Sequence, residues 1–173
     1  NILNRDFAAK KLNEKWLTDV TEFKYGDNAK LYLSAILDLK DKGIVSFAIG
    51  RHNNNQLVFN TFDLAVSKYP DAHPMFHSDR GFQYTSKQFK SRLDKAGMTQ
   101  SMSRVGRCID NGPMEGFWGI LKCEMYYLGN FKDYDSLASA IESYIYFYNN
   151  ERRQKKLNKM SPKTYRQLIE NAA

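Results

Sequence analysis

The sequence has few of the features that mark a membrane-spanning protein, a secreted protein or a protein stabilised by a structural metal site. Its 173 residues include only two cysteines, Cys108 and Cys123, which lie in unlike contexts without the spacing of a metal-ligand pair. No apolar run approaches the roughly 20 residues of a membrane span, and no secretory signal, internal repeat or low-complexity stretch is visible. We therefore expect a reduced, intracellular protein. Because the chain begins at Asn1 rather than Met, we also expect a fragment or a processed product.

An excess of one charge sign is also missing from the middle of the chain. The formal net charge is +7, but residues 16–150 carry fifteen basic and fifteen acidic side chains. Residues 1–15 contribute +2 and residues 151–173 contribute +5. Basic flanks suit a polyanion such as nucleic acid, whose neutralised phosphates release counterions. A basic helix that is merely solvated explains the charge equally well.

The chain does contain a clear order of hydrophobic patterns, in an ordinary composition of 42% hydrophobic and 26% charged residues. β-branched and apolar stretches separated by turns predict strands at 16–23, 31–40, 44–50, 73–79 and 99–103. Helical spacing predicts helices at 53–70, 85–98, 113–127, 134–150 and 162–171. Three antiparallel strands followed by strand–helix alternation predict an α/β protein with a five-stranded mixed sheet flanked by helices. This order fits a ribonuclease H-like fold.

One acidic residue stands inside a predicted strand. Asp19 lies between Thr18 and Val20, and strand alternation places it on the same face as Leu17. Asp is depleted in strand interiors. A carboxylate there needs a cation, a proton or a hydrogen-bond donor as compensation. Asp19 is therefore a candidate functional residue.

Two more acidic residues occupy positions where sites form. Asp79 ends the predicted strand 73–79 and precedes a turn, and ligands of open α/β sheets bind outside the carboxyl ends of strands. Glu115 lies in the first turn of the predicted helix 113–127. Lys122 follows it by seven residues, about two helical turns, and so shares its face.

Three carboxylates from two strands and one helix can converge on hard divalent cations. Mg²⁺ takes few carboxylates and keeps places for water and substrate phosphate. Two such ions about 4 Å apart support phosphodiester chemistry. Each acid taken singly also has a structural explanation, as half of a salt bridge or as a partner of a helix dipole.

Several blocks of the sequence resemble bacterial insertion-sequence transposases with a retroviral-integrase-like catalytic core. They are "WLTDVTEF", "HSDRGFQYTS", "SRVGRCIDNGPMEGFWGILKCE" and the closing "YNNERRQKKLNKMSPKTYRQ". That family carries an Asp-Asp-Glu triad with 35 residues between its second and third acids. Here residues 20–78 separate Asp19 from Asp79, and the 35 residues 80–114 separate Asp79 from Glu115. One departure is Gly116, where the family often has Ser.

The resemblance implies a ribonuclease H-like fold and DNA cleavage at element ends, followed by strand transfer into target DNA. It implies that Asp19, Asp79 and Glu115 are catalytic and hold two Mg²⁺ (or Mn²⁺) ions. The implied DNA contacts are Lys122, Arg104, Arg107, Asn111 and Arg80. For Asn111, capping of the helix is the favoured interpretation. His77 and Trp118 are interpreted as packed residues.

The resemblance also implies a domain organisation and partners. We expect a lead-in linker at 1–15, the catalytic core at 16–150, and a basic helical segment at 151–173 that packs on the core. The expected partners are DNA, both element ends and target, and further copies that form a multimer on DNA. A helix-turn-helix region upstream, or a companion protein, is absent from this fragment. We expect no membrane association, and a bacterial cytoplasmic location at the nucleoid.

Two other functions remain open at this point. A ribonuclease H-like nuclease could use the same triad and hydrolyse DNA without joining it. A basic nucleic-acid-binding module that has lost catalysis would also explain the charged flanks. Assays for joined products separate the first alternative from a transposase, and divalent-metal binding separates the second.

Overall fold

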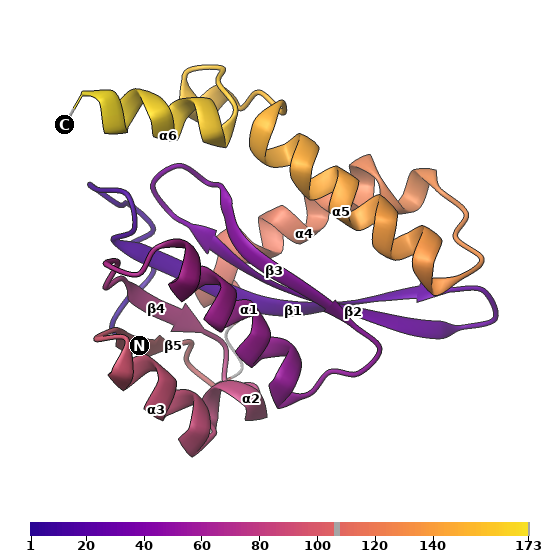
Figure 1. Ribbon diagram of the computed structural model, residues 1–173, viewed down its shortest axis with the longest axis horizontal. Coiled ribbons are helices and arrows are strands. Elements are labelled where there is room, and N and C mark those ends of the chain that lie inside the picture. The colour runs from indigo at the N-terminus through magenta and orange to yellow at the C-terminus, as the bar shows by residue number, and fades with distance from the viewer. Residues whose placement is uncertain (106–107, 173) are drawn as a thin grey trace.

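Five strands form one mixed sheet in the order β3-β2-β1-β4-β5 (Figure 1). The computed structural model describes residues 1–105 and 108–172. The strands are β1 (Lys15–Tyr25), β2 (Ala29–Asp38), β3 (Ile44–Gly50), β4 (Met75–Ser78) and β5 (Thr99–Met102). β1 to β3 pair antiparallel, whereas β4 runs parallel to β1 and β5 runs parallel to β4. The predicted α/β fold class, three antiparallel strands followed by strand–helix alternation, is confirmed.

Helices cover both faces of this sheet (Figure 1). They are α1 (Asn55–Lys68), α2 (Phe82–Thr85), α3 (Lys87–Lys95), α4 (Gly112–Glu124), α5 (Tyr134–Asn150) and α6 (Pro162–Asn171). Short 3₁₀ turns are η1 (Cys108–Asn111), η2 (Tyr126–Leu128) and η3 (Lys155–Leu157). Across the described part of the chain, no helix has the length and apolar character needed to cross a membrane.

Strand alternation in β1 sends neighbouring side chains into two separate cores. Leu17 packs in one core with Phe117 and Leu121 of α4. Trp16 packs in the other with Phe62 of α1 and Phe89 of α3. Each large apolar side chain buried in this way contributes about 1.5–3 kcal/mol. Because side chains two apart share a face, Asp19 lies on the α4 side of the sheet.

Two predicted helices have different bounds in the structure. The helix predicted at 85–98 is α3 and runs only from Lys87 to Lys95; Ser86 is extended and caps it by accepting a hydrogen bond from the Phe89 N–H, and the separate short helix α2 ends at Thr85. The helix predicted at 113–127 ends at Glu124. The Tyr126 hydroxyl bonds to both backbone groups of Lys24 and so draws the chain onto the end of β1.

Both flanks of the chain contact the sheet. The Leu3 side chain is buried, and its N–H donates to the Ser101 hydroxyl in β5. At the other end, Arg166 of α6 pairs with the buried carboxylates of Asp38 and Asp41. These contacts join the first and last segments to the same sheet and its helices.

Candidate active site

The pairing of β1 with β4 places two of the predicted acids at neighbouring positions. The two strands run parallel, with Leu17 opposite His77. Asp19 and Asp79 each follow two residues after this pair; Asp79 lies just past the end of β4 at Ser78, and its charge acts on the Asp19 carboxyl. Adjacent strands lie about 4.8 Å apart. The carboxyl end of β4 therefore delivers Asp79 beside the middle of β1.

The turn after β4 fixes the Asp79 side chain. The Asp79 Oδ1 atom accepts a hydrogen bond from the Gly81 N–H at 2.8 Å. A Cβ at position 81 would lie 2.9 Å from the Gln83 Oε1 atom and 3.1 Å from Asp79 Oδ1. Glycine at position 81 therefore permits the close turn that orients Asp79.

Helix α4 brings the third acid to the same place. Two of its side chains bond to β1: Asn111 Nδ2 donates to the Thr18 carbonyl oxygen at 3.0 Å, and Trp118 Nε1 donates to Asp19 Oδ2 at 3.0 Å. Glu115 lies four residues after Asn111 and three before Trp118, so all three share one helix face. Glu115 is exposed at this face. The contacts of α4 with β1 therefore place Glu115 on the side of the sheet that carries Asp19.

The electrostatics of Asp19 reflect this gathering of acids. Burial is the main factor that raises the pKa of Asp19, to about 6, and the negative charges of Asp79 and Glu115 raise it further. The hydrogen bond from Trp118 opposes this rise. A carboxylate that is costly to ionise and has two acidic neighbours is typical of a cation-binding site.

The donor set fits a hard divalent cation in its chemistry, although the carboxylates are not closed around one point. All three candidates offer carboxylate oxygens, the ligands that Mg²⁺ prefers. Within residues 1–105 and 108–172, no three His, Cys, Asp or Glu side chains are gathered closely enough to hold a metal ion. The three acids are therefore neighbours in an open arrangement.

The predicted DNA-contacting residues lie in different environments. Lys122 follows Glu115 on the same face of α4, and its ammonium lies 5.3 Å from the centre of the Phe23 ring. Arg80 is exposed, and its Nε donates to the Ser103 carbonyl oxygen. Arg104 directs its guanidinium to Asp110, with distances of 2.9 Å and 2.8 Å. Arg107 lies outside the described residues.

The prediction that Asn111 caps α4 through its side chain is wrong. Asn111 occupies the N-cap position, but its side chain makes no capping hydrogen bond. The amide donates instead to the Thr18 carbonyl oxygen in β1. The Asn111 Oδ1 atom is buried without a hydrogen-bond partner among the described residues.

Two residues near the site were missed by sequence reasoning. Trp118 is only 6% exposed, as expected of a packed residue, but it also donates to Asp19. The signal for this contact in the sequence was the position of Trp118, three residues after Glu115 on the same helix.

Asp110 is the second residue. It is fully buried and accepts hydrogen bonds from Asn1, Arg5 and Arg104. The arginines hold the pKa of Asp110 well below its usual range. No sequence pattern indicates this cluster.

The residues around Asp79 mostly serve the fold. His77 is fully buried and bonds to the hydroxyls of Ser101 and Ser103, which confirms its interpretation as a packed histidine. Gln83 is buried and donates to Asn53. The hydroxyl of the buried Tyr84 lies 3.3 Å from that of Thr18. These side chains are therefore occupied with contacts inside the fold.

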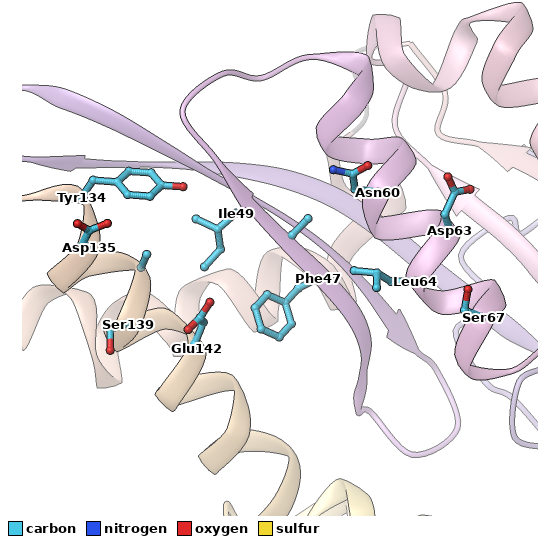
Figure 2. A pocket seen from close by; sticks show the side chains of 12 residues that line it. Phe47, Ile49, Asn60, Asp63, Leu64, Ser67, Tyr134, Asp135, Ser139 and Glu142 are labelled. Atoms are coloured by element: carbon cyan, nitrogen blue, oxygen red, sulfur yellow. The ribbon is translucent and has the colours of Figure 1, made fainter.

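A large hollow lies elsewhere, along the outer strand of the sheet. Figure 2 shows it between α1 and α5, with Phe47 and Ile49 of β3 between the two helices. Its volume is about 890 Å³. Asp63, Asp135 and Glu142 stand on its rim, and none of the triad acids lines it. The open site at the carboxyl end of β4 is therefore separate from this hollow.

The chain matches known sequences over most of its length. Two models described as "Integrase core domain" match residues 9–108 and 115–168. An uncharacterized transposase-like protein of Haemophilus influenzae is 43% identical over 96% of the chain and 76% of its own length. InsK of Escherichia coli, described as a proposed transposase for insertion sequence element IS150, is 42% identical over 96% of the chain. The chain spans 59% of InsK.

Solved structures show the same fold at low sequence identity. The HTLV-2 integrase catalytic core domain in complex with magnesium superposes with a TM-score of 0.73 at 18% identity, over 92% of this chain and 99% of that one. The catalytic core domain of BIV integrase gives a TM-score of 0.68 at 14% identity, over 92% and 97%. The ribonuclease H-like architecture is thus shared with these cores. By its sequence matches, the chain belongs to the integrase core domain family.

Proposed function

We propose that the chain is the catalytic core of an insertion-sequence transposase. It cleaves the DNA phosphodiester at element ends and transfers the strand into target DNA. The observation that carries this proposal is the attachment of α4, which bears Glu115, to β1 by two hydrogen bonds, one of them to Asp19 itself, beside the charge of Asp79. The family membership supports it, because the relatives include proteins named as transposases.

Asp19, Asp79 and Glu115 would hold two divalent cations, Mg²⁺ or Mn²⁺. Such ions, when bound, activate an attacking oxygen and stabilise charge on the leaving one. The HTLV-2 core solved with magnesium supports this choice of metal. The open arrangement of the acids supports metal loading that is completed by substrate phosphate.

The other residues of the site orient the ligands and the DNA. The Gly81 N–H donates to Asp79 Oδ1, and this bond within the turn fixes the orientation of the carboxylate and so of Asp79 Oδ2. Lys122 lies on the Glu115 face of α4 and would contact a phosphate of the element end.

The remaining DNA contacts are weaker. Arg80 and Arg104 would add phosphate contacts of this kind, since each already bonds within the loop that begins at Ser103. Arg107 and Asn111 complete the proposed DNA-contacting set.

The proposal extends to partners and organisation. Residues 16–150 form the catalytic core, with 1–15 and 151–173 built onto it through Leu3 and Arg166. Two element ends must be held together for transposition, so the enzyme acts as a multimer on DNA. End recognition is supplied by a helix-turn-helix region or companion protein outside this chain. We place its action at the nucleoid of a bacterial cell.

The test is a joining assay with pre-cut element ends, a supercoiled target and Mn²⁺ or Mg²⁺. The ends are taken from the inverted repeats that flank the coding sequence. Joined products, seen as slower-migrating DNA, are the expected result. Hydrolysed ends without joining would replace the proposal with a nuclease. Neither product, together with no divalent binding by calorimetry in the presence of DNA, would indicate a binding module.

A further inference from the structure

Trp118 offers a hydrogen bond to one of the carboxylates of the proposed metal site. Its Nε1 lies 3.0 Å from Asp19 Oδ2, although the side chain is only 6% exposed. An indole N–H donates and never accepts. It can therefore donate to the Asp19 carboxylate but cannot itself be a ligand of the cation.

The Trp118 ring is held in place by its neighbours. Its centroid lies 5.1 Å from that of Phe117, which in turn lies 4.9 Å from the Tyr148 ring. All three side chains belong to the core between the sheet and the helices α4 and α5. A donor on a packed ring has little rotational freedom. The indole therefore fixes the direction of the Asp19 carboxylate.

Only one oxygen of Asp19 is occupied in this way. Among the side chains that the structure describes, none donates to Asp19 Oδ1, whereas Oδ2 accepts from Trp118. The indole thus holds Oδ2, the Val20 N–H also bonds to the carboxylate, and no other described side chain occupies Oδ1. Outer hydrogen bonds of this kind orient metal ligands, and their loss typically costs about 10–100-fold in metal affinity or activity.

The same bond holds the helix that carries Glu115. Helix α4 contains Gly116 and Gly119, and a Cβ at either position would meet no atom within 4 Å. Glycine weakens a helix relative to alanine. The side-chain bonds of Asn111 and Trp118 to β1 compensate for this weakness at two points along the helix. Glu115 lies between these two points.

We propose that Trp118 is a positioning residue of the active site. Its indole N–H sets the orientation of the Asp19 carboxylate and, through α4, the separation between Asp19 and Glu115. The inference rests on the proposed function, because it treats these two acids as ligands of one metal site.

The test compares two tryptophan variants. Trp118→Phe keeps an aromatic ring in the core and removes the donor. Trp16→Phe is the matched control: Trp16 is fully buried on the opposite face of β1, and its indole donates to Asn13 Oδ1 at 3.3 Å. Each variant loses one indole hydrogen bond, but only the first faces Asp19. Circular dichroism establishes that both are folded.

The first measurement is the Mn²⁺ concentration that gives half-maximal joining of pre-cut ends. Trp118→Phe is expected to need about 10–100-fold more Mn²⁺ than the wild-type protein. Trp16→Phe is expected to match the wild type. Equal Mn²⁺ dependence in the two variants would overturn the inference.

The second measurement does not depend on joining. The chain has two tryptophans, so it gives two indole signals in a ¹H–¹⁵N spectrum. Asp19→Ala is expected to shift the Trp118 signal and leave that of Trp16 unchanged, and an unmoved Trp118 signal would refute the hydrogen bond.

A titration with Mg²⁺, followed on the amide signal of Val20, tests the metal site itself. Trp118→Phe should require a higher Mg²⁺ concentration than the wild type to reach half-saturation. If the wild type joins no DNA, the proposed function fails, while this titration still decides the role of Trp118.

Discussion

Asn111 donates its side-chain amide to the carbonyl oxygen of Thr18 at 3.0 Å, and this bond joins the start of α4 to the middle of β1. Asn111 precedes Glu115 by four residues, and Thr18 directly precedes Asp19. The bond therefore links the elements that carry two of the proposed ligands. The Asn111 amide, which stands at the N-cap position of α4, therefore attaches the helix to β1 in place of capping it.

Replacing Asp19 by Asn should stabilise the metal-free protein above pH 6. The folded-state pKa of about 6 exceeds the ordinary value near 4, so the unfolded chain loses this proton first as the pH rises. The free energy of unfolding of the wild type therefore falls between about pH 4 and pH 6, by on the order of 3 kcal/mol. Asp19→Asn removes this contribution. Urea unfolding at pH 4, 5, 6 and 7.5 in a chelator measures it.

The control for this experiment is Asp27→Asn, which changes an exposed carboxylate in the turn between β1 and β2. Its unfolding curves should follow those of the wild type at every pH. If the difference between Asp19→Asn and wild type is the same at pH 4 and pH 7.5, burial of Asp19 is not the source of the effect.

Loss of Arg166 should destabilise the whole unit. Its guanidinium lies 2.8 Å from Asp38 Oδ2 and also pairs with Asp41, and both carboxylates are buried. Arg166→Met keeps the apolar stem and leaves two buried acids without their cation, which typically costs about 3–5 kcal/mol. Arg153→Met removes the same charge from an exposed position of the same segment and should cost little. Thermal unfolding of the two variants makes the comparison; equal melting temperatures would show that α6 is not anchored in this way.

Replacing Lys122 by Ala should weaken DNA binding without destroying the fold. If the Lys122 ammonium binds one phosphate, its removal reduces the slope of log K against log salt by about 1. Lys30→Ala is the matched change, because the Lys30 ammonium already pairs with Glu22 at 3.0 Å. Fluorescence anisotropy with labelled element ends at several salt concentrations gives both slopes. Identical slopes for the two variants would remove Lys122 from the DNA surface.

Divalent cations should bind the free protein weakly. The three acids are neighbours but do not close around one point within the described residues. Calorimetry without DNA is expected to give a millimolar Mg²⁺ affinity, and pre-cut element ends should tighten it, because phosphate oxygens complete the ligand set. Micromolar binding by the free protein would contradict this expectation.

The sheet and its helices could be predicted from the sequence because their patterns are local. Alternation in β1 correctly placed Leu17 and Asp19 on one face, and apolar spacing located α1 and α5 closely. The short helix α2 at Phe82–Thr85 was not predicted, since four residues are too few to show a helical period. The end of α4 depended on a distant contact between Tyr126 and Lys24.

The candidate site likewise combines features that the sequence predicts with features that depend on tertiary contacts. The positions of Asp79 and Glu115 follow from a strand end, a helix start and the spacing between them. The bonds of Trp118 to Asp19 and of Asn111 to Thr18 join residues more than ninety positions apart. The burial of Asp110 beneath Arg5 and Arg104 depends equally on tertiary packing. No local period encodes such pairs.

The most direct test of the proposed function compares Asp79→Asn with Asp71→Asn in the joining assay. Both variants remove one carboxylate, but Asp71 is exposed in the turn before β4, whereas the Asp79 carboxylate is fixed beside β1. Asp71→Asn should join pre-cut ends as the wild type does, and Asp79→Asn should yield no joined product above background in Mg²⁺ or Mn²⁺. Wild-type joining by Asp79→Asn would contradict the assignment of the triad.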